Sequence, residues 1–380
     1  MLKTKKSLNK LAITRMMNKP FSLYVHIPFC EKICDYCDFI KLQYFRKFAI
    51  PYLEALEKEL ESYDIGSLYT IYVGGGTPTA LEDDLFEKLL KMLFPYTQQK
   101  CFVEYTVEAN PESLSETKIK LMKQYGVNRV SLGVQSTDDR ILEAINRHHT
   151  FKQVKEAVSL LKENGIDNIN ADLILGLPHA SKELFKKDLE NIVDLGVNHI
   201  SCYSLTVHPH TVLFNKKFKP IDDDDMRELY DIAHEYLKSK GFAHYEVSNW
   251  AESNASLHNI TYWRNQQYYG CGLGASGYIG DIRYKNTVNL DKYLKHEYVE
   301  EREVLTKRDK YVYEIMLALR SVHAGLTLSH IKEEYDVDLY EKWDVIEELI
   351  KEELIMYHAG EIAITYEGMM VLDQIILKLI

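Results

Sequence analysis

Three of the six cysteines are grouped closely enough to bind one metal centre. Cys30, Cys34 and Cys37 form a CxxxCxxC pattern directly after a strand-like run at residues 22–27. Thiolates at this spacing can turn back within one loop to face an iron–sulfur cluster. Three ligands for a four-iron cluster would leave one iron open to a small molecule, so the pattern predicts a [4Fe–4S] site that also binds a chelating ligand.

Two other interpretations of this loop remain open. Tetrahedral zinc would need a fourth ligand, for which His26 or Asp35 could serve. Alternatively, the three cysteines could be structural residues without a metal. The remaining cysteines are scattered and are predicted to be small buried side chains; these are Cys101, Cys202 and Cys271.

Glycines and polar residues follow several of the other predicted strands. The run of three glycines that ends in Gly75 and Gly76 precedes Thr77, and glycine allows a backbone to approach a ligand closely. Each of these residues alone would more often be structural. The glycines and polar residues together lie towards the carboxyl ends of successive predicted strands, where the sites of barrels form. This placement favours one common site.

The elements that would position these residues alternate along the chain. Strand-like runs lie at residues 22–27, 70–73, 103–108, 129–134, 168–174 and 199–204, and helical patterns at 50–63, 81–93, 115–125, 151–164 and 182–195. Such alternation predicts parallel βα units in an α/β fold. Six successive units favour a whole or partial barrel, and a doubly wound open sheet is the competing layout.

The alternation ends after about residue 207. An acidic run at residues 222–225 opens a helical pattern that continues to residue 240. From about residue 305, amphipathic helices are predicted at 307–321, 328–335 and 340–351, followed by a strand pair at 354–357 and 361–365 and a final helix. Helices that end in a small hairpin predict a C-terminal, mainly helical, winged-helix-like domain.

Composition restricts the class of protein. The 380 residues carry 46 basic and 57 acidic side chains, a net charge of −11, which argues against a general nucleic-acid binder. No apolar run approaches the ~20 residues needed to span a bilayer. The basic N-terminus lacks the apolar core of a signal peptide, so we expect a cytoplasmic, reducing compartment.

The stretch YVHIPFCEKICDYCDF resembles the radical S-adenosylmethionine (SAM) superfamily. More narrowly, the chain from about residue 22 onward is similar to the family that contains oxygen-independent coproporphyrinogen III oxidase and haem chaperones. The resemblance implies a partial (β/α)6 TIM-like radical SAM barrel. It also implies that the three cysteines hold the cluster, that SAM binds its open iron, and that reductive cleavage of SAM yields a radical.

The resemblance also implies which residues contact SAM. Glu108 in TVEANPE matches a ribose-binding carboxylate, and Arg147 in INRHH could pair with the methionine carboxylate. The full implied set is Tyr24, Gly75, Gly76, Thr77, Glu108, Gln135, Arg147 and Asp172. The implied domains are a flexible extension at 1–20, the barrel at 21–240, a connecting region at 241–304 and the helical domain at 305–380.

Two departures from the oxidase pattern favour the haem-chaperone branch. The oxidase signature continues as CxxxCxxCxC, whereas Phe39 stands two residues after Cys37 here. Only some twenty residues precede the first strand, and the oxidase carries a longer N-terminal arm. The expected function is therefore a haem chaperone that transfers haem to apo-haemoproteins. The alternatives are radical decarboxylation of coproporphyrinogen III and another radical reaction on a tetrapyrrole.

The HNxxYW sequence at residues 258–263 resembles a signature of the same relatives. Imidazole can ligate haem iron and aromatic rings can pack on a macrocycle, so this segment is a candidate haem region; its residues are His258, Asn259, Tyr262 and Trp263. His208, His210 and His244 are further candidates. The resemblance extends to clients that include respiratory membrane proteins, met at the inner face of the membrane. A homodimer is left open.

Overall fold

Seven parallel strands form the centre of the fold in the computed structural model, which describes residues 22–322 and 325–380. The predicted extension at residues 1–20 lies outside the described residues. The parallel strands run in the order β11-β1-β4-β5-β6-β7-β8 within a sheet of 12 strands. They are β1 (Ser22–Ile27), β4 (Thr70–Gly75), β5 (Glu104–Ala109), β6 (Arg129–Gln135), β7 (Asn168–Leu175), β8 (His199–Ser204) and β11 (Tyr268–Cys271).

Apolar and polar residues alternate along these strands although both sets are buried. In β5, Tyr105 and Val107 are buried in the hydrophobic core, whereas Glu104 and Thr106 between them are buried polar residues. Successive strand residues point to opposite faces, so one face of the sheet is apolar and the other is polar. The apolar face packs against helices, and the polar face encloses the space in which the site lies.

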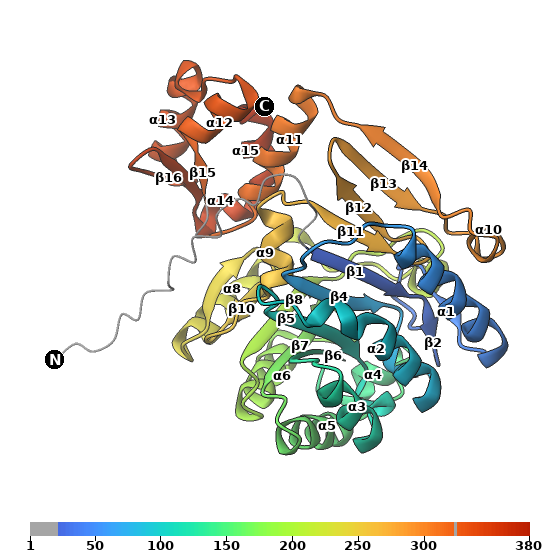
Figure 1. The fold of residues 1–380 in the computed structure, drawn as a ribbon. Coiled ribbons are helices and arrows are strands. Elements are labelled where there is room, and N and C mark those ends of the chain that lie inside the picture. Colours follow the sequence, from blue (N-terminus) through green and yellow to red (C-terminus); the bar gives the residue numbers. More distant parts are fainter. Residues whose placement is uncertain (1–21, 323–324) are drawn as a thin grey trace.

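The helices that cover the apolar face follow the strands in turn. They are α1 (Arg46–Glu61), α2 (Asp83–Thr97), α3 (Glu116–Gln124), α5 (Phe151–Glu163), α6 (Lys182–Asp194) and α8 (Asp223–Ser239). The short helix α4 (Asp139–Ala144) packs through Ile141 in a smaller, separate cluster. Because the strands β1 to β8 lie in chain order, every crossover moves in the same direction and its helix falls on the same side (Figure 1). A doubly wound sheet would reverse its order, so the partial barrel prediction is confirmed.

The sheet is extended at both ends by antiparallel strands. At one end lie β10 (Asn249–Ala251) and β9 (Ala243–Glu246), and at the other lie β12 (Ser276–Ile279), β13 (Ile282–Asn286) and β14 (Val299–Val304). Short helices α7 (Val212–Asn215), α9 (Leu257–Trp263) and α10 (Leu290–Leu294) interrupt this part of the chain. The segment at residues 241–304, which is expected to be a connecting region, contributes six strands to the main sheet.

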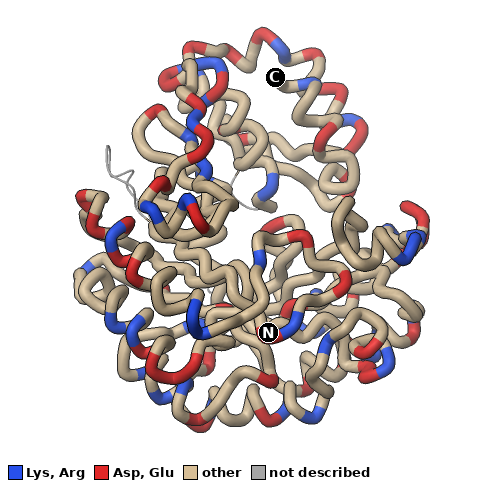
Figure 2. Tube along the Cα trace, turned by 90° about the vertical axis from the view of Figure 1, so that its right-hand side faces the viewer, with Lys and Arg blue, Asp and Glu red and all other residues tan. Residues whose placement is uncertain are grey.

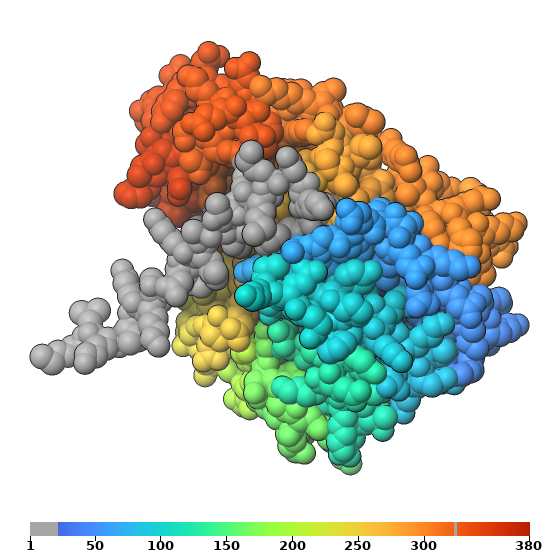
Figure 3. Space-filling model, viewed as in Figure 1, coloured from blue at the N-terminus to red at the C-terminus, as the bar shows by residue number. Residues whose placement is uncertain are grey.

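The C-terminal residues form a unit with a hydrophobic cluster of its own. In chain order it contains α11 (Lys307–Ala318), β15 (Leu326–Thr327), α12 (Leu328–Tyr335), α13 (Trp343–Lys351), β16 (Ile355–His358), β17 (Glu361–Ile364), α14 (Tyr366–Met370) and α15 (Leu372–Leu379). Its three strands pair in the order β15-β17-β16, which adds one strand to the predicted hairpin. In Figure 3 this unit is the red lobe at one end of the molecule.

Charged residues lie mainly on the outer helices. Figure 2 shows basic and acidic residues interspersed over the barrel helices and the C-terminal unit, with few on the central strands. In the described part of the chain, no helix combines the length and apolar character that crossing a membrane requires.

Candidate functional site

A cavity of about 370 Å³ opens at the carboxyl ends of the parallel strands. Cys30, Cys34 and Cys37 all line it, and all six cysteines of the chain are free thiols. The loop that carries the three cysteines follows β1 and is closed by the parallel pairing of β2 (Phe29–Cys30) with β3 (Leu42–Gln43). The structure therefore brings the predicted cluster ligands to one side of one cavity.

The donor set suits a cluster of several metal atoms. Among residues 22–322 and 325–380, no three His, Cys, Asp or Glu side chains converge closely enough to hold a single metal ion. Cys30, Cys34 and Cys37 line one cavity, and a [4Fe–4S] cluster would take one thiolate on each of three irons. Burial raises the pKa of Cys30 to about 12 and raises that of Cys37, so binding a metal must displace protons from buried thiols.

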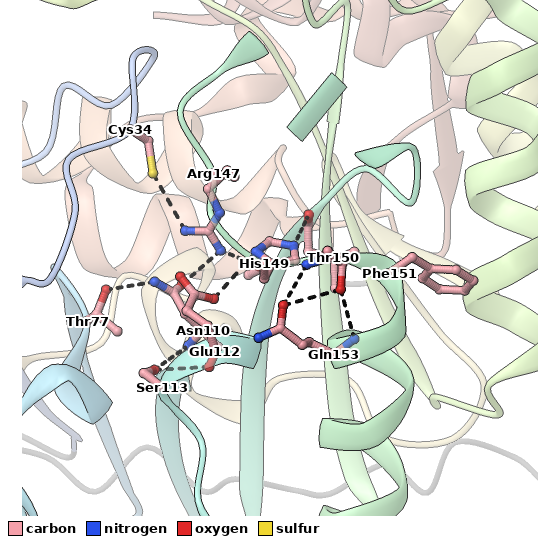
Figure 4. A network of polar contacts seen from close by, with 12 residues as sticks. Cys34, Thr77, Asn110, Glu112, Ser113, Arg147, His149, Thr150, Phe151 and Gln153 are labelled. Carbon is pink, nitrogen blue, oxygen red and sulfur yellow. Dashed lines mark hydrogen bonds and ion pairs between the residues drawn. The ribbon is translucent and has the colours of Figure 1, made fainter. Parts of the chain in front are cut away.

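A chain of polar contacts joins Cys30 to Cys34, and Figure 4 shows its part from Cys34 through Arg147 and Asn110 to Thr77. The Thr77 hydroxyl lies 3.7 Å from the Cys30 Sγ and accepts a hydrogen bond from the Asn110 Nδ2 at 3.2 Å. The Asn110 Oδ1 accepts from the Arg147 Nη2 at 3.0 Å, and the Arg147 Nη1 lies 3.6 Å from the Cys34 Sγ. Arg147 also donates to the Gly133 carbonyl at 2.5 Å, which ties the cysteine loop to β6.

Arg147 places charge beside Cys34 and also binds Asn110. Asn110 is a site residue that the sequence analysis did not select. The buried guanidinium supplies positive charge beside Cys34, which stabilises a thiolate. Asn110 lines the cavity two residues after Glu108 and connects Arg147 to Thr77. Asn110 could have been selected from the sequence because it lies in the TVEANPE segment with Glu108.

Glu108 is held at the wall of the cavity by two donors. The Tyr72 hydroxyl donates to its Oε1 at 2.7 Å, and the Gly75 N–H donates to its Oε2 at 2.9 Å. Burial raises the pKa of Glu108 to about 7. A Cβ on Gly74 would lie 2.6 Å from the Glu108 carboxyl carbon, so this glycine leaves the carboxylate its space. The carboxylate is thus fixed and available to accept from hydroxyl groups of a ligand.

Another part of the cavity wall carries a buried polar atom that has no protein partner in the described part of the chain. Gln135 lines the cavity in a left-handed conformation with a φ of 63°, and its buried Oε1 has no hydrogen-bond partner among the described residues. Asp172 also lines the cavity, accepts from the Ser131 hydroxyl at 3.0 Å and has a pKa that burial raises. An orphaned acceptor and two constrained carboxyl groups fit a polar, cationic ligand such as SAM.

The glycine-rich loop borders the cavity, but its N–H groups are already used. Gly75 donates to Glu108, Gly76 donates to the Ile27 carbonyl at 2.9 Å and Thr77 donates to the Phe29 carbonyl at 2.8 Å. The loop can hold a ligand through its shape or its carbonyl oxygens, and not through free N–H groups. Tyr24 lies behind this wall, where its ring stacks on Tyr72 at 6.1 Å.

The HNxxYW residues lie at the other end of the strands. The Nδ1 of His258 is 2.7 Å from the hydroxyl of Thr70, the first residue of β4, and its Nε2 is 2.8 Å from the Tyr262 hydroxyl. Burial lowers the pKa of His258 to about 3, and the residue is 1% exposed. Both ring nitrogens are therefore engaged in an enclosed, neutral imidazole that does not face the cavity.

Helix α9, which carries this motif, closes the amino-terminal end of the barrel. Glu104, the first residue of β5, accepts from the backbone N–H groups of Leu257 at 2.9 Å and His258 at 3.0 Å. Asn259 is half-buried at the first turn, and the Arg320 guanidinium lies 5.7 Å from the Trp263 ring centre. In barrels of this kind the amino-terminal face contributes stability and the carboxyl-terminal face carries the site.

The other candidate histidines differ in their access to the cavity. His208 lines it, with its Nε2 3.3 Å from an Asp38 carboxylate oxygen. His210 is exposed in a left-handed turn with a φ of 75°. His244 is buried and stacks on Trp250 at 4.2 Å between ring centres. Phe39 also lines the cavity, with 66% of its surface exposed.

Comparisons with known proteins agree with this geometry. The family model of the Radical SAM superfamily matches residues 24–192. A relative named heme chaperone HemW from Lactococcus lactis is 39% identical over 362 residues, which cover 93% of this chain and 95% of the relative. The HemW relative from Bacillus subtilis is 36% identical over 91% of this chain and 96% of its own length.

Among solved structures, the Escherichia coli coproporphyrinogen III oxidase HemN has the same fold. The two structures align with a TM-score of 0.84 over 95% of this chain and 90% of that chain, at 23% sequence identity. At this identity the likeness concerns the fold and not the reaction. The cavity, its three thiols and the full-length similarity to these relatives lead to one conclusion: the chain belongs to the radical SAM superfamily, within the HemW family.

Proposed function

We propose that the protein is a haem chaperone, which binds haem and passes it to apo-haemoproteins. The similarity to relatives named heme chaperone over 93% of the chain carries this proposal. A [4Fe–4S] cluster would be held by Cys30, Cys34 and Cys37, and SAM would occupy the cavity beside it. When bound, the cluster and SAM supply one-electron chemistry on this scaffold.

The protein residues would divide the work of holding these groups. Arg147 would place positive charge beside the thiolates and reach a ligand carboxylate. Glu108, oriented by Tyr72 and Gly75, would accept from ribose hydroxyls, and the free Gln135 Oε1 would accept from a further donor. This set supports the binding of SAM in the cavity.

Phe39 separates this proposal from the oxidase alternative. The oxidase signature has a fourth cysteine two residues after the third, and here that position is an exposed phenyl ring on the cavity wall. A phenyl ring cannot replace a thiol in proton or radical chemistry, whereas it can pack on a flat apolar ligand.

Clients would include respiratory haemoproteins, reached by the protein at the inner face of the membrane.

The decisive experiment compares the two functions in one preparation. The protein is reconstituted anaerobically with iron and sulfide, titrated with haem, and mixed with an apo-haemoprotein whose activity reports transfer. In parallel, the same preparation is assayed with coproporphyrinogen III, SAM and a reductant. Saturable haem binding with transfer is expected. Formation of protoporphyrinogen would establish the oxidase alternative, and failure to bind haem would reject the chaperone function.

A further inference from the structure

The rim of the cavity exposes aromatic surface that the fold itself does not use. Phe39 is 66% exposed and Tyr203 is 43% exposed, and both line the cavity, from the cysteine loop and from β8. Large apolar side chains that are exposed together beside a pocket commonly mark a ligand surface. The Phe39 ring therefore offers an apolar surface at the entrance, and the Tyr203 ring adds aromatic surface to the cavity, with its hydroxyl beside Ser201 and Asp172.

The charges at this rim complement an anionic ligand. Lys32 and Lys41 line the same cavity, and the Lys41 Nζ donates to the carbonyls of Cys37 at 2.6 Å and Phe39 at 3.2 Å. Asp38, the acid beside them, lies 3.3 Å from His208. A flat apolar ring system with two carboxylate groups, the chemistry of haem, matches two aromatic rings flanked by two ammonium groups.

The HNxxYW segment offers no comparable entrance. His258 is 1% exposed, and its ring nitrogens are held by Thr70 and Tyr262. A macrocycle could reach it only if α9 left the end of the barrel, which would break the two backbone hydrogen bonds to Glu104. A carrier must also release its haem, and an open rim permits release whereas an enclosed site opposes it.

We propose that haem binds at the rim of the cavity, against Phe39 and Tyr203 with its propionates towards Lys32 and Lys41, and not at the HNxxYW segment. This inference rests on the proposed function and assigns its location. It places haem at the mouth of the cavity in which SAM would bind. The HNxxYW segment on α9, at the amino-terminal end of the barrel, then has a structural role.

The test uses the reconstituted full-length protein and titrates haem by its Soret absorbance. The Phe39→Ala, Tyr203→Ala double variant should bind haem at least tenfold more weakly than the parent protein. Phe39→Trp and Tyr203→Phe keep an aromatic ring and should bind within about twofold of it. The matched control is Tyr340→Ala in the C-terminal unit, which removes an aromatic ring with 52% exposure away from the cavity. Iron content and circular dichroism verify that each variant is folded.

The outcomes separate the location from the function. If the parent protein does not bind haem, the proposed function fails and the location fails with it. If the parent binds haem and the folded double variant binds equally well, only the location is rejected. Loss of haem binding on His258→Gln with retention in the double variant would assign haem to the HNxxYW segment instead.

Discussion

The cysteine loop shows how individual residues prepare a site for a metal. Cys30 and Cys34 are linked through Thr77, Asn110 and Arg147, so their thiols are positioned by bonds that do not depend on a metal. Such outer contacts normally orient the ligands of a metal centre and tune its charge. The loop is therefore preorganised on the side of β5 and β6.

Replacing any one of the three cysteines should abolish stable cluster binding. With Cys34→Ser, we expect reconstituted protein to lose most of its iron and sulfide, because two thiolates cannot hold the cluster. Iron and sulfide analysis and the absorbance of the cluster measure this. Cys101→Ser is the control, since its Sγ only donates to the Leu68 carbonyl at 3.2 Å. Unchanged iron content in Cys34→Ser would refute the ligand assignment.

Glu108 should make stability depend on pH. Burial raises its folded pKa to about 7 from an ordinary value of 4.5, so the folded state binds more protons than the unfolded state between these values. Stability contributed by the protonated form is complete below pH 4.5 and is lost as pH rises through 7. Glu59 and Glu246, whose pKa values burial also raises to about 7, add to the same trend.

The variant Glu108→Gln isolates the contribution of Glu108 to the pH dependence of stability. It cannot ionise, so its melting temperature relative to the parent should rise between pH 5 and pH 8, while its affinity for SAM falls. Thermal unfolding at the two pH values and calorimetric titration with SAM measure the two effects. Glu57→Gln, on the exposed side of α1, is the control. An identical melting difference at both pH values would contradict the prediction.

Residue types and spacing predicted part of this site. The cysteines, Glu108, Gln135, Arg147 and Asp172 follow or lie in successive strands, and the structure brings all of them to one cavity. The position of His258 was not predictable in this way. A motif in a segment after the barrel can return to either end of the strands, and only the contacts with Thr70 and Glu104 decide which.

Among the elements, α9 is connected to the site through a ring contact with Tyr72. The His258 ring lies 5.2 Å from the Tyr72 ring, and the Tyr72 hydroxyl donates to Glu108. Glu104 holds the start of α9 by accepting from two backbone N–H groups. The helix thus supports, from the closed end of the barrel, the tyrosine that orients the carboxylate at the open end.

Removing the Glu104 carboxylate should loosen this support. In Glu104→Ala the buried N–H groups of Leu257 and His258 lose their acceptor, which we expect to cost on the order of 2–3 kcal/mol of unfolding free energy and to weaken SAM binding several-fold. Denaturant unfolding and SAM titration measure these effects. Glu104→Gln keeps one acceptor oxygen and should recover part of both.

A remote helix cap is the matched control for this variant. Ser115 caps α3 by accepting from the Lys118 N–H at 3.2 Å. Ser115→Ala should cost about 1 kcal/mol and leave SAM binding unchanged. If Glu104→Ala lowered stability without any change in SAM affinity, α9 would stabilise the fold without supporting the SAM site.

The elements themselves were predicted unevenly. The barrel strands are short apolar runs followed by helices of regular periodicity, and β1 and β8 begin and end where the sequence predicts. Strand β11 pairs in parallel with β1, which is distant in sequence, and the short antiparallel strands β12 to β14 continue the sheet from it. Their pairing depends on tertiary contacts such as the Tyr284 hydroxyl with Gly270, which periodicity does not reveal.

On the scale of the whole molecule, the hydrophobic cluster of the barrel and that of the C-terminal unit meet at Tyr366. Tyr366 at the start of α14 packs against both clusters, stacks on Tyr230 of α8 at 5.9 Å and lies 4.0 Å from the His234 ring. Beside it, Arg227 forms an ion pair with Glu367 at 2.9 Å. The C-terminal unit is thus docked onto α8 and yet has the apolar residues to keep its own fold.

The same docking protects an edge of the main sheet. The Val247 N–H donates to the Arg320 carbonyl at 3.2 Å, and the Val322 N–H donates to the Tyr245 carbonyl at 3.1 Å. These bonds cover the open edge beside β9, where an exposed strand would invite aggregation. The sequence predicted the helices and hairpin of this unit, because their periodicity is local. It did not predict the docking, which depends on single side chains.

Tyr366→Ala should therefore loosen the docking without unfolding the C-terminal unit. The ring loses its contacts with Tyr230, His234 and Arg227, so the amides of Val247 and Val322 should exchange hydrogen at least tenfold faster. Peptides from the helices α11, α12, α13 and α15 themselves should keep their protection because their cluster is intact. Hydrogen-exchange mass spectrometry measures both, with Tyr340→Ala as the control. Faster exchange throughout α11 to α15 would show instead that the unit depends on the barrel for its fold.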